Sequence, residues 1–279
     1  MIHPIPTLDH VVINVRDRID EGAATYRRLG FTLTERGYHT LGSMNHLAMF
    51  GTDYLELIAA PPGSTSRPEI MQAPEGLNSL VFGTEDSAAT YAAMQQAGVP
   101  VFPPGEFSRP VALPEGTRDA VFRTVRLMPG TVTAGRLYFC HHFTRDLVWR
   151  DEWRHHGNGV TGIARAVIAA RDPPDLGALF GRMFGTDAMR PISGGLTLTV
   201  GVSRFDVVTP DALRAEFGDA APDGGGRDSY MAALEFRTRS VDAAWQVMRR
   251  GEVSGARRDN DRVIVPAIEA FGATLAFCL

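Results

Sequence analysis

The stretch LDHVVINVRD, Leu8–Asp17, is an apolar run that ends in Arg-Asp and carries a histidine near its start. A run of β-branched residues before a turn is typical of a buried strand. A second stretch, IARAVIAARD, Ile163–Asp172, has the same apolar run and the same ending, with Arg165 at the position of His10. The two similar stretches indicate an internal repeat, and the repeated unit is the basis for predicting the fold.

The repeat extends to four units, each of which starts with a strand and continues with a helix and further strands. Apolar residues at helical spacing follow each opening strand, and the later strands alternate or contain short β-branched runs. The four opening strands are LDHVVINVRD, LNSLVFGTED, IARAVIAARD and AALEFRTRS. We therefore predict four β-α-β-β-β units in one chain.

A polar, glycine-bearing segment separates the second unit from the third. Its sequence is VWRDEWRHHGNG, from Val148 to Gly159, and such a composition is typical of a connection between domains. We expect an N-terminal pair of units at residues 1–155 and a C-terminal pair at residues 156–279.

The composition is that of a globular protein, with 44% hydrophobic and 22% charged residues. Every basic residue is an arginine, which excludes chemistry that needs a lysine, such as Schiff-base formation. The formal charge of −4 argues against a nucleic-acid partner, which would need a basic surface. No apolar run reaches the roughly 20 residues that cross a bilayer, and no secretory signal is visible. We expect a cytoplasmic protein without a membrane partner, with Cys140 and Cys278 as core residues.

Tandem units with a histidine on the first strand and a glutamate on the fourth resemble the vicinal oxygen chelate superfamily, in its glyoxalase-like branch. The motifs that carry the resemblance are LDHVVINVRD, GYHTLGSMNH, DYLELIA and YFCHHFTRDLVWR. The resemblance implies an α+β fold of the glyoxalase/bleomycin resistance/extradiol dioxygenase-like type, in which tandem βαβββ modules pair into two concave mixed β-sheets. It also implies a divalent metal ion in the hollow of a sheet, and that hollow would be the active site.

The first strand and the fourth strand of the first unit carry the first candidate metal ligands. Alternation along LDHVVINV places Leu8, His10 and Asn14 on one face, which would line the hollow. A strand histidine there either binds a metal ion or forms a hydrogen bond in the core. Glu56 lies within DYLELIA, where a carboxylate must be solvated, paired or metal-bound.

Two adjacent histidines in the last strand of the second unit offer a third ligand. His141 and His142 face opposite ways along a strand, and the pattern alone does not choose between them. The resemblance favours His142. The set His10, Glu56 and His142 suits a divalent Zn, Fe, Mn or Ni ion and leaves coordination positions open for substrate. The resemblance could place a fourth ligand at Ser79, but serine is a poor ligand, so a three-residue site is expected.

Other residues are candidates for chemistry and binding around the hollow. GYHTLGSMNHLAMF reads as a glycine-rich turn, and the resemblance makes it a rim of the hollow, with His39 or Asn45 as hydrogen-bonding or acid/base residues. We take Glu56 and His39 as the catalytic candidates. The alternatives are backbone turn chemistry for this segment and packing between the halves for Trp149 and Arg150. The candidates for substrate binding are Asn14, His46, Trp149 and Arg150.

The C-terminal pair of units lacks the same residues. The equivalent positions hold Arg165, Ala233, Asp206 and an apolar residue near Phe277. All eight histidines lie at or before His156, so this half cannot form an imidazole site. We expect an internal ion pair between Arg165 and Asp206 in a degenerate hollow.

The sequence thus predicts a metal-dependent enzyme of the lyase or isomerase type that acts on a small oxygenated substrate. A divalent ion would polarise a carbonyl or stabilise an oxyanion. Two alternatives remain at this point: an extradiol-type dioxygenase, and a non-catalytic protein that binds or sequesters a small molecule. A homodimer is a possible assembly.

Overall fold

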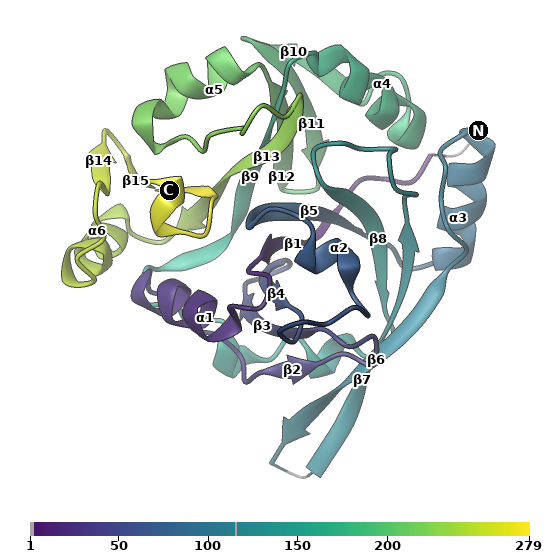
Figure 1. Ribbon diagram of the computed structural model, residues 1–279, viewed down its shortest axis with the longest axis horizontal. Coiled ribbons are helices and arrows are strands. Elements are labelled where there is room, and N and C mark those ends of the chain that lie inside the picture. The colour runs from purple at the N-terminus through teal and green to yellow at the C-terminus, as the bar shows by residue number, and fades with distance from the viewer. Residues whose placement is uncertain (1–2, 115) are drawn as a thin grey trace.

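Two eight-stranded mixed sheets form the framework of the computed structural model, which describes residues 3–114 and 116–279. The strand order of the first sheet is β2-β3-β4-β1-β5-β8-β7-β6, and that of the second is β10-β11-β12-β9-β13-β16-β15-β14. The orders are the same once the second is renumbered, so the repeat in the sequence is a repeat in space (Figure 1). The prediction of paired β-α-β-β-β units in two mixed sheets is confirmed.

Each sheet is assembled from two units. The first unit contains β1 (Leu8–Asn14), α1 (Ile19–Arg28), β2 (Gly37–Tyr38), β3 (Met44–Met49) and β4 (Tyr54–Ala59). After the short helix α2 (Pro68–Met71), the second unit contains β5 (Gly76–Gly83), α3 (Ser87–Gln96), β6 (Gly105–Leu113), β7 (Gly116–Arg126) and β8 (Arg136–His142). The third contains β9 (Val160–Ala170), α4 (Pro173–Phe184), β10 (Met189–Ile192), β11 (Gly195–Val200) and β12 (Ser203–Val208). After α5 (Pro210–Phe217), the fourth contains β13 (Ser229–Thr238), α6 (Val241–Arg250), β14 (Arg257–Asp259), β15 (Arg262–Val265) and β16 (Thr274–Cys278).

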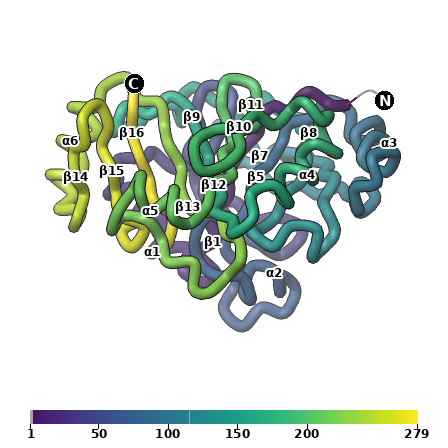
Figure 2. Tube along the Cα trace, turned by 90° about the horizontal axis from the view of Figure 1, so that it is seen from above, coloured from purple at the N-terminus to yellow at the C-terminus, as the bar shows by residue number. Residues whose placement is uncertain are grey.

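The opening strands join the units in pairs. β1 runs parallel to β4 of its own unit and antiparallel to β5, and β9 pairs in the same way with β12 and β13. Side chains cap the free N–H groups at the start of three helices: Asp86 for α3, Thr209 for α5 and Ser240 for α6. Helices α3 and α6 lie at opposite ends of the molecule (Figure 2). In the described part of the chain, no helix is long and apolar enough to cross a membrane.

One large apolar core connects the two halves, while each hollow has a smaller core of its own. The large core combines the backs of both sheets with the buried faces of the helices. Phe236 of β13 is fully buried there and packs against Phe31 and Phe50 of the first unit, at ring-centroid distances of 5.3 and 5.8 Å. The halves are therefore packed against each other through aromatic side chains.

A β-bulge in β1 changes the alternation that the sequence predicted. Leu8 pairs with Phe82 of β5 and His10 pairs with the next residue, Val81, so Asp9 is an extra residue in β1 without a partner of its own. Leu8 consequently joins the large core instead of the hollow, and Asp9 is brought beside His10. The predicted turn at Asn45 and His46 is also corrected, because both residues lie in β3, where their side chains face opposite sides.

Asp53 joins the two sheets just before β4. Its Oδ1 accepts a hydrogen bond from the backbone N–H of Ile163 in β9, at 3.0 Å. Burial raises the pKa of the Asp53 carboxyl to about 7, and the hydrogen bond from Ile163 and the charge of Arg237 offset only part of this effect. A buried carboxylate at the junction therefore opposes stability once it is ionised.

The free energy of unfolding of the wild-type protein should fall as the pH rises from about 4 to about 7, because Asp53 loses its proton. We expect this pH dependence to be absent in Asp53→Asn. A carboxyl whose pKa is raised on folding binds its proton more tightly in the folded state, so deprotonation favours unfolding across that range. Asparagine keeps the acceptor oxygen and carries no charge. In urea titrations, the variant should gain on the order of 3 kcal/mol over the wild type between pH 5 and pH 8. The exposed Asp187→Asn is the control, and an equal pH dependence of wild type and Asp53→Asn would refute the expectation.

Candidate functional site

The N-terminal hollow contains a small, largely enclosed cavity of about 60 Å³. Its walls come from both units of the first sheet, with Tyr54, Phe107 and Phe122 among the apolar side chains. The sheet nearly closes on itself here, because the backbone N–H of Thr40, just after β2, donates to Ser108 O in β6 at 3.0 Å. A cavity of this size admits an ion with a few waters, or a group of a few heavy atoms.

His10 is held in one orientation at the base of the cavity. Its Nδ1 lies 2.5 Å from Asp9 Oδ1, and its ring stacks on Tyr54 with a centroid distance of 4.4 Å. Its Nε2 faces the cavity, 3.2 Å from Tyr138 Oη and 3.7 Å from Glu56 Oε2. Burial alone would raise the pKa of Asp9, but His142 and His10 outweigh it and hold this pKa well below its usual range. A carboxylate that accepts from Nδ1–H leaves Nε2 with a free lone pair.

Glu56 completes a polar group on β4, the strand next to β1. Asn45 Nδ2 donates to Glu56 Oε1 at 2.6 Å and lies 3.2 Å from His39 Nε2. The Nδ1 of His39 lies 2.8 Å from Ser43 Oγ, and its Nε2 is 3.9 Å from Glu56 Oε1. Burial lowers the pKa of His39 to about 4, with the nearby arginines adding to the effect, so its imidazole is neutral at physiological pH. Oε1 of Glu56 is therefore fixed, and Oε2 is the oxygen turned to His10.

His142 lies on the same face of β8 as Tyr138, but its side chain contacts Asp9 instead of meeting His10 and Glu56 at one point. Its Nε2 lies 3.0 Å from Asp9 Oδ1, so Asp9 receives both His10 and His142. The structure thus brings His10 and Glu56 together and links His142 to them only through Asp9. His141 points to the other side of the strand, where its ring packs on Phe143.

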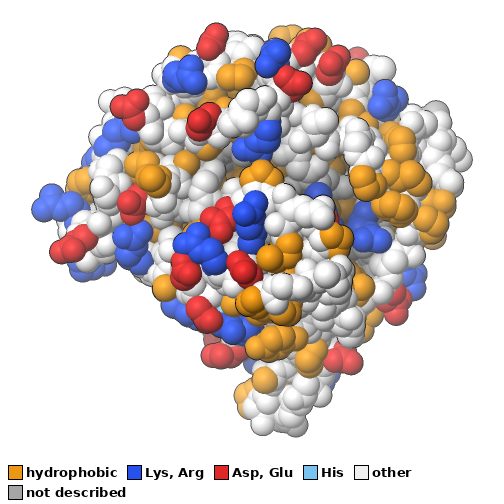
Figure 3. All heavy atoms as spheres, in the orientation of Figure 1, with side chains coloured by type: hydrophobic (Ala, Val, Ile, Leu, Met, Phe, Trp, Pro, Cys, Tyr) orange, Lys and Arg blue, Asp and Glu red, His pale blue; other side chains and the backbone are white. Residues whose placement is uncertain are grey.

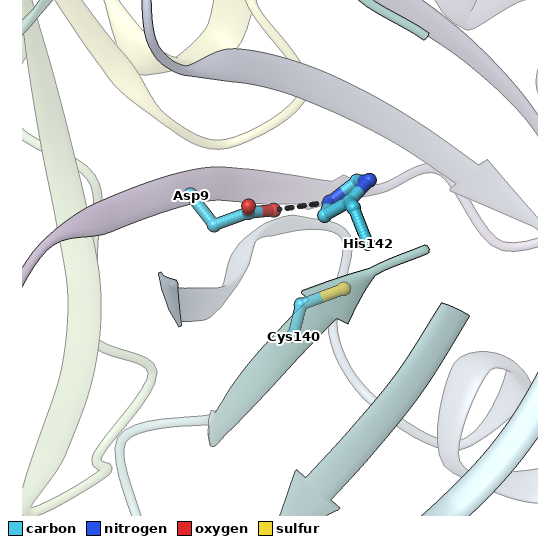
Figure 4. Close-up of side chains that lie close together, drawn as sticks. All are labelled: Asp9, Cys140 and His142. Carbon is cyan, nitrogen blue, oxygen red and sulfur yellow. Dashed lines mark hydrogen bonds and ion pairs between the residues drawn. The ribbon is translucent and has the colours of Figure 1, made fainter. Parts of the chain in front are cut away.

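A different set of side chains has the spacing of a metal site. Within the described residues, one ligand atom each of Asp9, Cys140 and His142 lies within 4.8 Å of the others (Figure 4). Burial raises the pKa of the Cys140 thiol well above its usual value, so this thiol is protonated unless an ion displaces the proton. This possible metal cluster lies directly behind His10.

Strand register explains why Tyr138, and not His142, lies beside His10 and Glu56. The partner of His10 on β4 is Tyr54, two residues before Glu56. The partner of Ser79 on β8 lies two residues before Tyr138. Ser79 occupies the place of His10 in the second unit, so Tyr138 is the counterpart of Glu56, and the predicted histidine lies further along β8. Aligning the two closing strands, YLELIA and RLYFCHH, at their first residues places Tyr138 at the position of Glu56, so the sequence already contained this correspondence.

The residues expected to bind substrate lie mostly outside the cavity. Asn14 holds the segment after β4, since its Nδ2 donates to Ile70 O at 2.9 Å and Pro74 O at 3.1 Å. His46 faces away from the hollow, with its Nδ1 2.8 Å from Thr34 O. The alternation of β3 dictates this, because Asn45 takes the inward position.

The two expected residues after β8 also lie apart from the cavity. Arg150 forms an ion pair with Glu152 at 2.5 Å. Trp149 is buried behind the hollow, with ring-centroid distances of 5.3 Å to Tyr54 and 5.0 Å to His142. It therefore supports the site from behind.

The hollow of the second sheet is filled by charged side chains. Arg165 Nε donates to Asp206 Oδ2 at 2.5 Å, which confirms the predicted ion pair. The guanidinium also contacts Glu216 at 2.6 Å and Glu235 at 3.2 Å. The positive charge of Arg165 in this hollow is therefore balanced by the carboxylates that it contacts.

Comparisons with known proteins agree with this architecture. A family model described as the glyoxalase-like domain matches residues 8–184. A hypothetical protein from Staphylococcus aureus has a TM-score of 0.69 at 13% identity, over 98% of this chain and 99% of that one. A triple mutant of 4-hydroxymandelate synthase from Streptomyces coelicolor has a TM-score of 0.58 at 11% identity, over 98% and 92%. A xylose isomerase-like TIM barrel/4-hydroxyphenylpyruvate dioxygenase fusion protein has a TM-score of 0.56 at 16% identity, over 99% of this chain and 49% of that one. No curated protein gave a significant match.

Proposed function

Because the chain belongs to the family of glyoxalase-like domain proteins, we propose that its N-terminal hollow is the active site of a metal-dependent enzyme. The reaction would be of the lyase or isomerase type, on a small oxygenated substrate. The observation that carries the proposal is the pair formed by His10 Nε2 and Glu56 Oε2, which lie 3.7 Å apart in the wall of the cavity.

The donor set fits a divalent ion at this pair. A histidine that binds a metal commonly donates its other N–H to a carboxylate, and Asp9 plays that part for His10 at 2.5 Å. A nitrogen and an oxygen that bind one ion lie a few ångströms apart, as these two atoms do. His10 and Glu56 would therefore hold the ion, with Asp9 orienting the imidazole. Open positions would remain for substrate oxygens.

The surrounding residues would perform the rest of the chemistry. A bound ion would polarise a substrate oxygen as a Lewis acid. Glu56 would be both a ligand of the ion and the acceptor for a proton from a carbon beside that oxygen, with Asn45 holding its Oε1 in place. The neutral His39 can accept a hydrogen bond or a proton at Nε2. Tyr54, Phe107 and Phe122 supply an apolar part of the wall around these groups.

We expect His10→Ala and Glu56→Gln each to raise the Kd for Mn²⁺ by at least about tenfold in titration calorimetry. His10→Ala removes the nitrogen donor, and Glu56→Gln replaces the carboxylate with a neutral, weaker amide oxygen. The control is His141→Ala, because its side chain points to the other face of β8. A loss of Mn²⁺ binding in His142→Ala or Cys140→Ser, with His10→Ala unaffected, would instead place the ion at the cluster behind His10.

A non-catalytic binding protein is the second candidate. It is favoured by Tyr138, which stands where a further ligand would complete the site. Failure of the wild-type protein to bind Mn²⁺ at all would support this candidate. The extradiol-type dioxygenase has less support, because the predicted set of His10, Glu56 and His142 is not gathered around one point: His10 Nε2 faces Glu56, whereas His142 Nε2 contacts Asp9.

A further inference from the structure

Four arginines from separate parts of the chain surround the N-terminal cavity. They are Arg67 before α2, Arg109 in β6, Arg126 at the end of β7 and Arg136 at the start of β8. Among the described residues that line the cavity, Glu56 is the sole carboxylate. On the face of the molecule drawn in Figure 3, by contrast, basic and acidic side chains are intermingled. The lining of this hollow therefore carries an excess of positive charge.

Arg109 is the most unusual of the four. It is only 3% exposed, and within the described part of the chain it has no hydrogen-bond or ion-pair partner, with Nη2 fully buried. A side chain at Gly37 would collide with this guanidinium and with Asn45 Oδ1, so the glycine makes room for the arginine. Burial lowers the pKa of Arg109, and Glu56 offsets only part of this effect, from beyond ion-pair distance. A buried guanidinium without a direct ion-pair partner is costly, and it fits here because position 37 has no side chain.

The other three arginines lie where the cavity opens. Arg67, Arg126 and Arg136 also line an adjoining outer chamber of about 700 Å³. Arg126 and Arg136 pack over the rings of Phe102 and Tyr138, each at 5.5 Å, and neither has a carboxylate partner within the described ranges. Arg67 alone is paired, with Glu69 at 2.6 Å. The entrance therefore carries uncompensated positive charge as well.

The second hollow shows how the same fold neutralises the charge of a buried arginine with carboxylates of its own. Arg165 there contacts three carboxylates, from Asp206, Glu216 and Glu235. Arg109 contacts none. From this contrast we infer that the N-terminal hollow binds a small organic anion, whose carboxylate or phosphate group enters the inner cavity and pairs with Arg109. The larger part of the ligand would lie in the outer chamber, which has Phe102, Leu127 and Met128 in its wall.

Size and geometry restrict the ligand further. The inner cavity of about 60 Å³ takes an acidic group of a few heavy atoms, while the chamber holds a ring-sized body. A guanidinium binds both carboxylate and phosphate through two parallel hydrogen bonds, so Arg109 accepts either group. This inference rests on the proposed function, because both place the substrate in this hollow. Its own observations are those on the arginines.

The test measures the binding of phenylacetate, phenyl phosphate and the neutral phenylacetamide to EDTA-dialysed protein by titration calorimetry. We expect at least one anion to bind, and the amide to bind at least about tenfold more weakly. The anion that binds identifies the acidic group. Absence of binding by both anions, or equal binding by the amide, would overturn the inference. Because no metal is present, failure here is distinguishable from failure of the Mn²⁺ titration.

Arg109→Met should weaken binding of that anion by at least about tenfold, and Arg109→Lys should weaken it less. The melting temperature of Arg109→Met should stay the same or rise, because the change removes an unpaired buried charge. Arg171→Met is the control, since Arg171 lies on the surface of the other half. Unchanged binding in Arg109→Met would overturn the inference, as would a lowered melting temperature, which would reveal a structural partner for Arg109.

Discussion

Arg165→Met is expected to reduce the free energy of unfolding by about 3–5 kcal/mol. Arg165 is 6% exposed and forms ion pairs with Asp206 at 2.5 Å, Glu216 at 2.6 Å and Glu235 at 3.2 Å. Methionine fills a similar space but leaves buried carboxylates without their main counter-charge. Arg262 still reaches Glu216 and Glu235, so the protein should fold.

Urea unfolding at pH 7 measures this effect. Arg171→Met is the matched control, because Arg171 pairs with Asp228 at an exposed site where both side chains are 77% accessible. A triple variant that adds Asp206→Asn and Glu235→Gln should recover much of the stability, since it removes the unpaired charges as well. If Arg165→Met were as stable as the wild type, the second hollow would not be held by its charges.

The second large effect is expected for Phe236→Ala, which should cost about 3–5 kcal/mol. Phe236 is fully buried in β13, and its ring packs against Phe31, Phe50 and Phe277 at centroid distances of 5.3, 5.8 and 5.7 Å. The substitution leaves a cavity between the first and fourth units, because the surrounding rings come from separate parts of the chain and are held there by their own packing.

This variant also tests whether the halves unfold as one unit. Unfolding followed by circular dichroism and by tryptophan fluorescence should show one transition in the wild type, shifted as a whole in Phe236→Ala. Ile268→Ala, at a position that is 89% exposed, is the control for loss of an apolar side chain. Two separate transitions, of which the variant moves only the later one, would show that the shared core does not couple the halves.

Strand periodicity and repetition predicted the four β-α-β-β-β units, and the resemblance to the vicinal oxygen chelate superfamily implied how these units pair into two sheets. The four opening strands contain the apolar runs that a sheet buried on its back requires, and each became a central strand. Alternation also placed His10 and Glu56 on the hollow side, where the structure brings them within 3.7 Å. These predictions succeed because they depend on a period of two residues within one strand.

The features that the sequence did not reveal depend on the pairing between strands. A bulge at Asp9 puts two polar residues beside each other, and alternation excludes such an arrangement. The choice of Tyr138 over His142 depends on the register between β5 and β8. Arg109 lies in a segment rich in proline and glycine, and its burial follows from the contact between β2 and β6 at the two edges of the sheet. None of these relations is a local property of the sequence.

The most direct test of the metal site is an anomalous difference map from crystals soaked in Mn²⁺. The account predicts one peak within bonding reach of His10 Nε2 and Glu56 Oε2, inside the cavity that these residues line. A peak bound instead by Asp9, Cys140 and His142, or no peak in the hollow at full Mn²⁺ saturation, would contradict it.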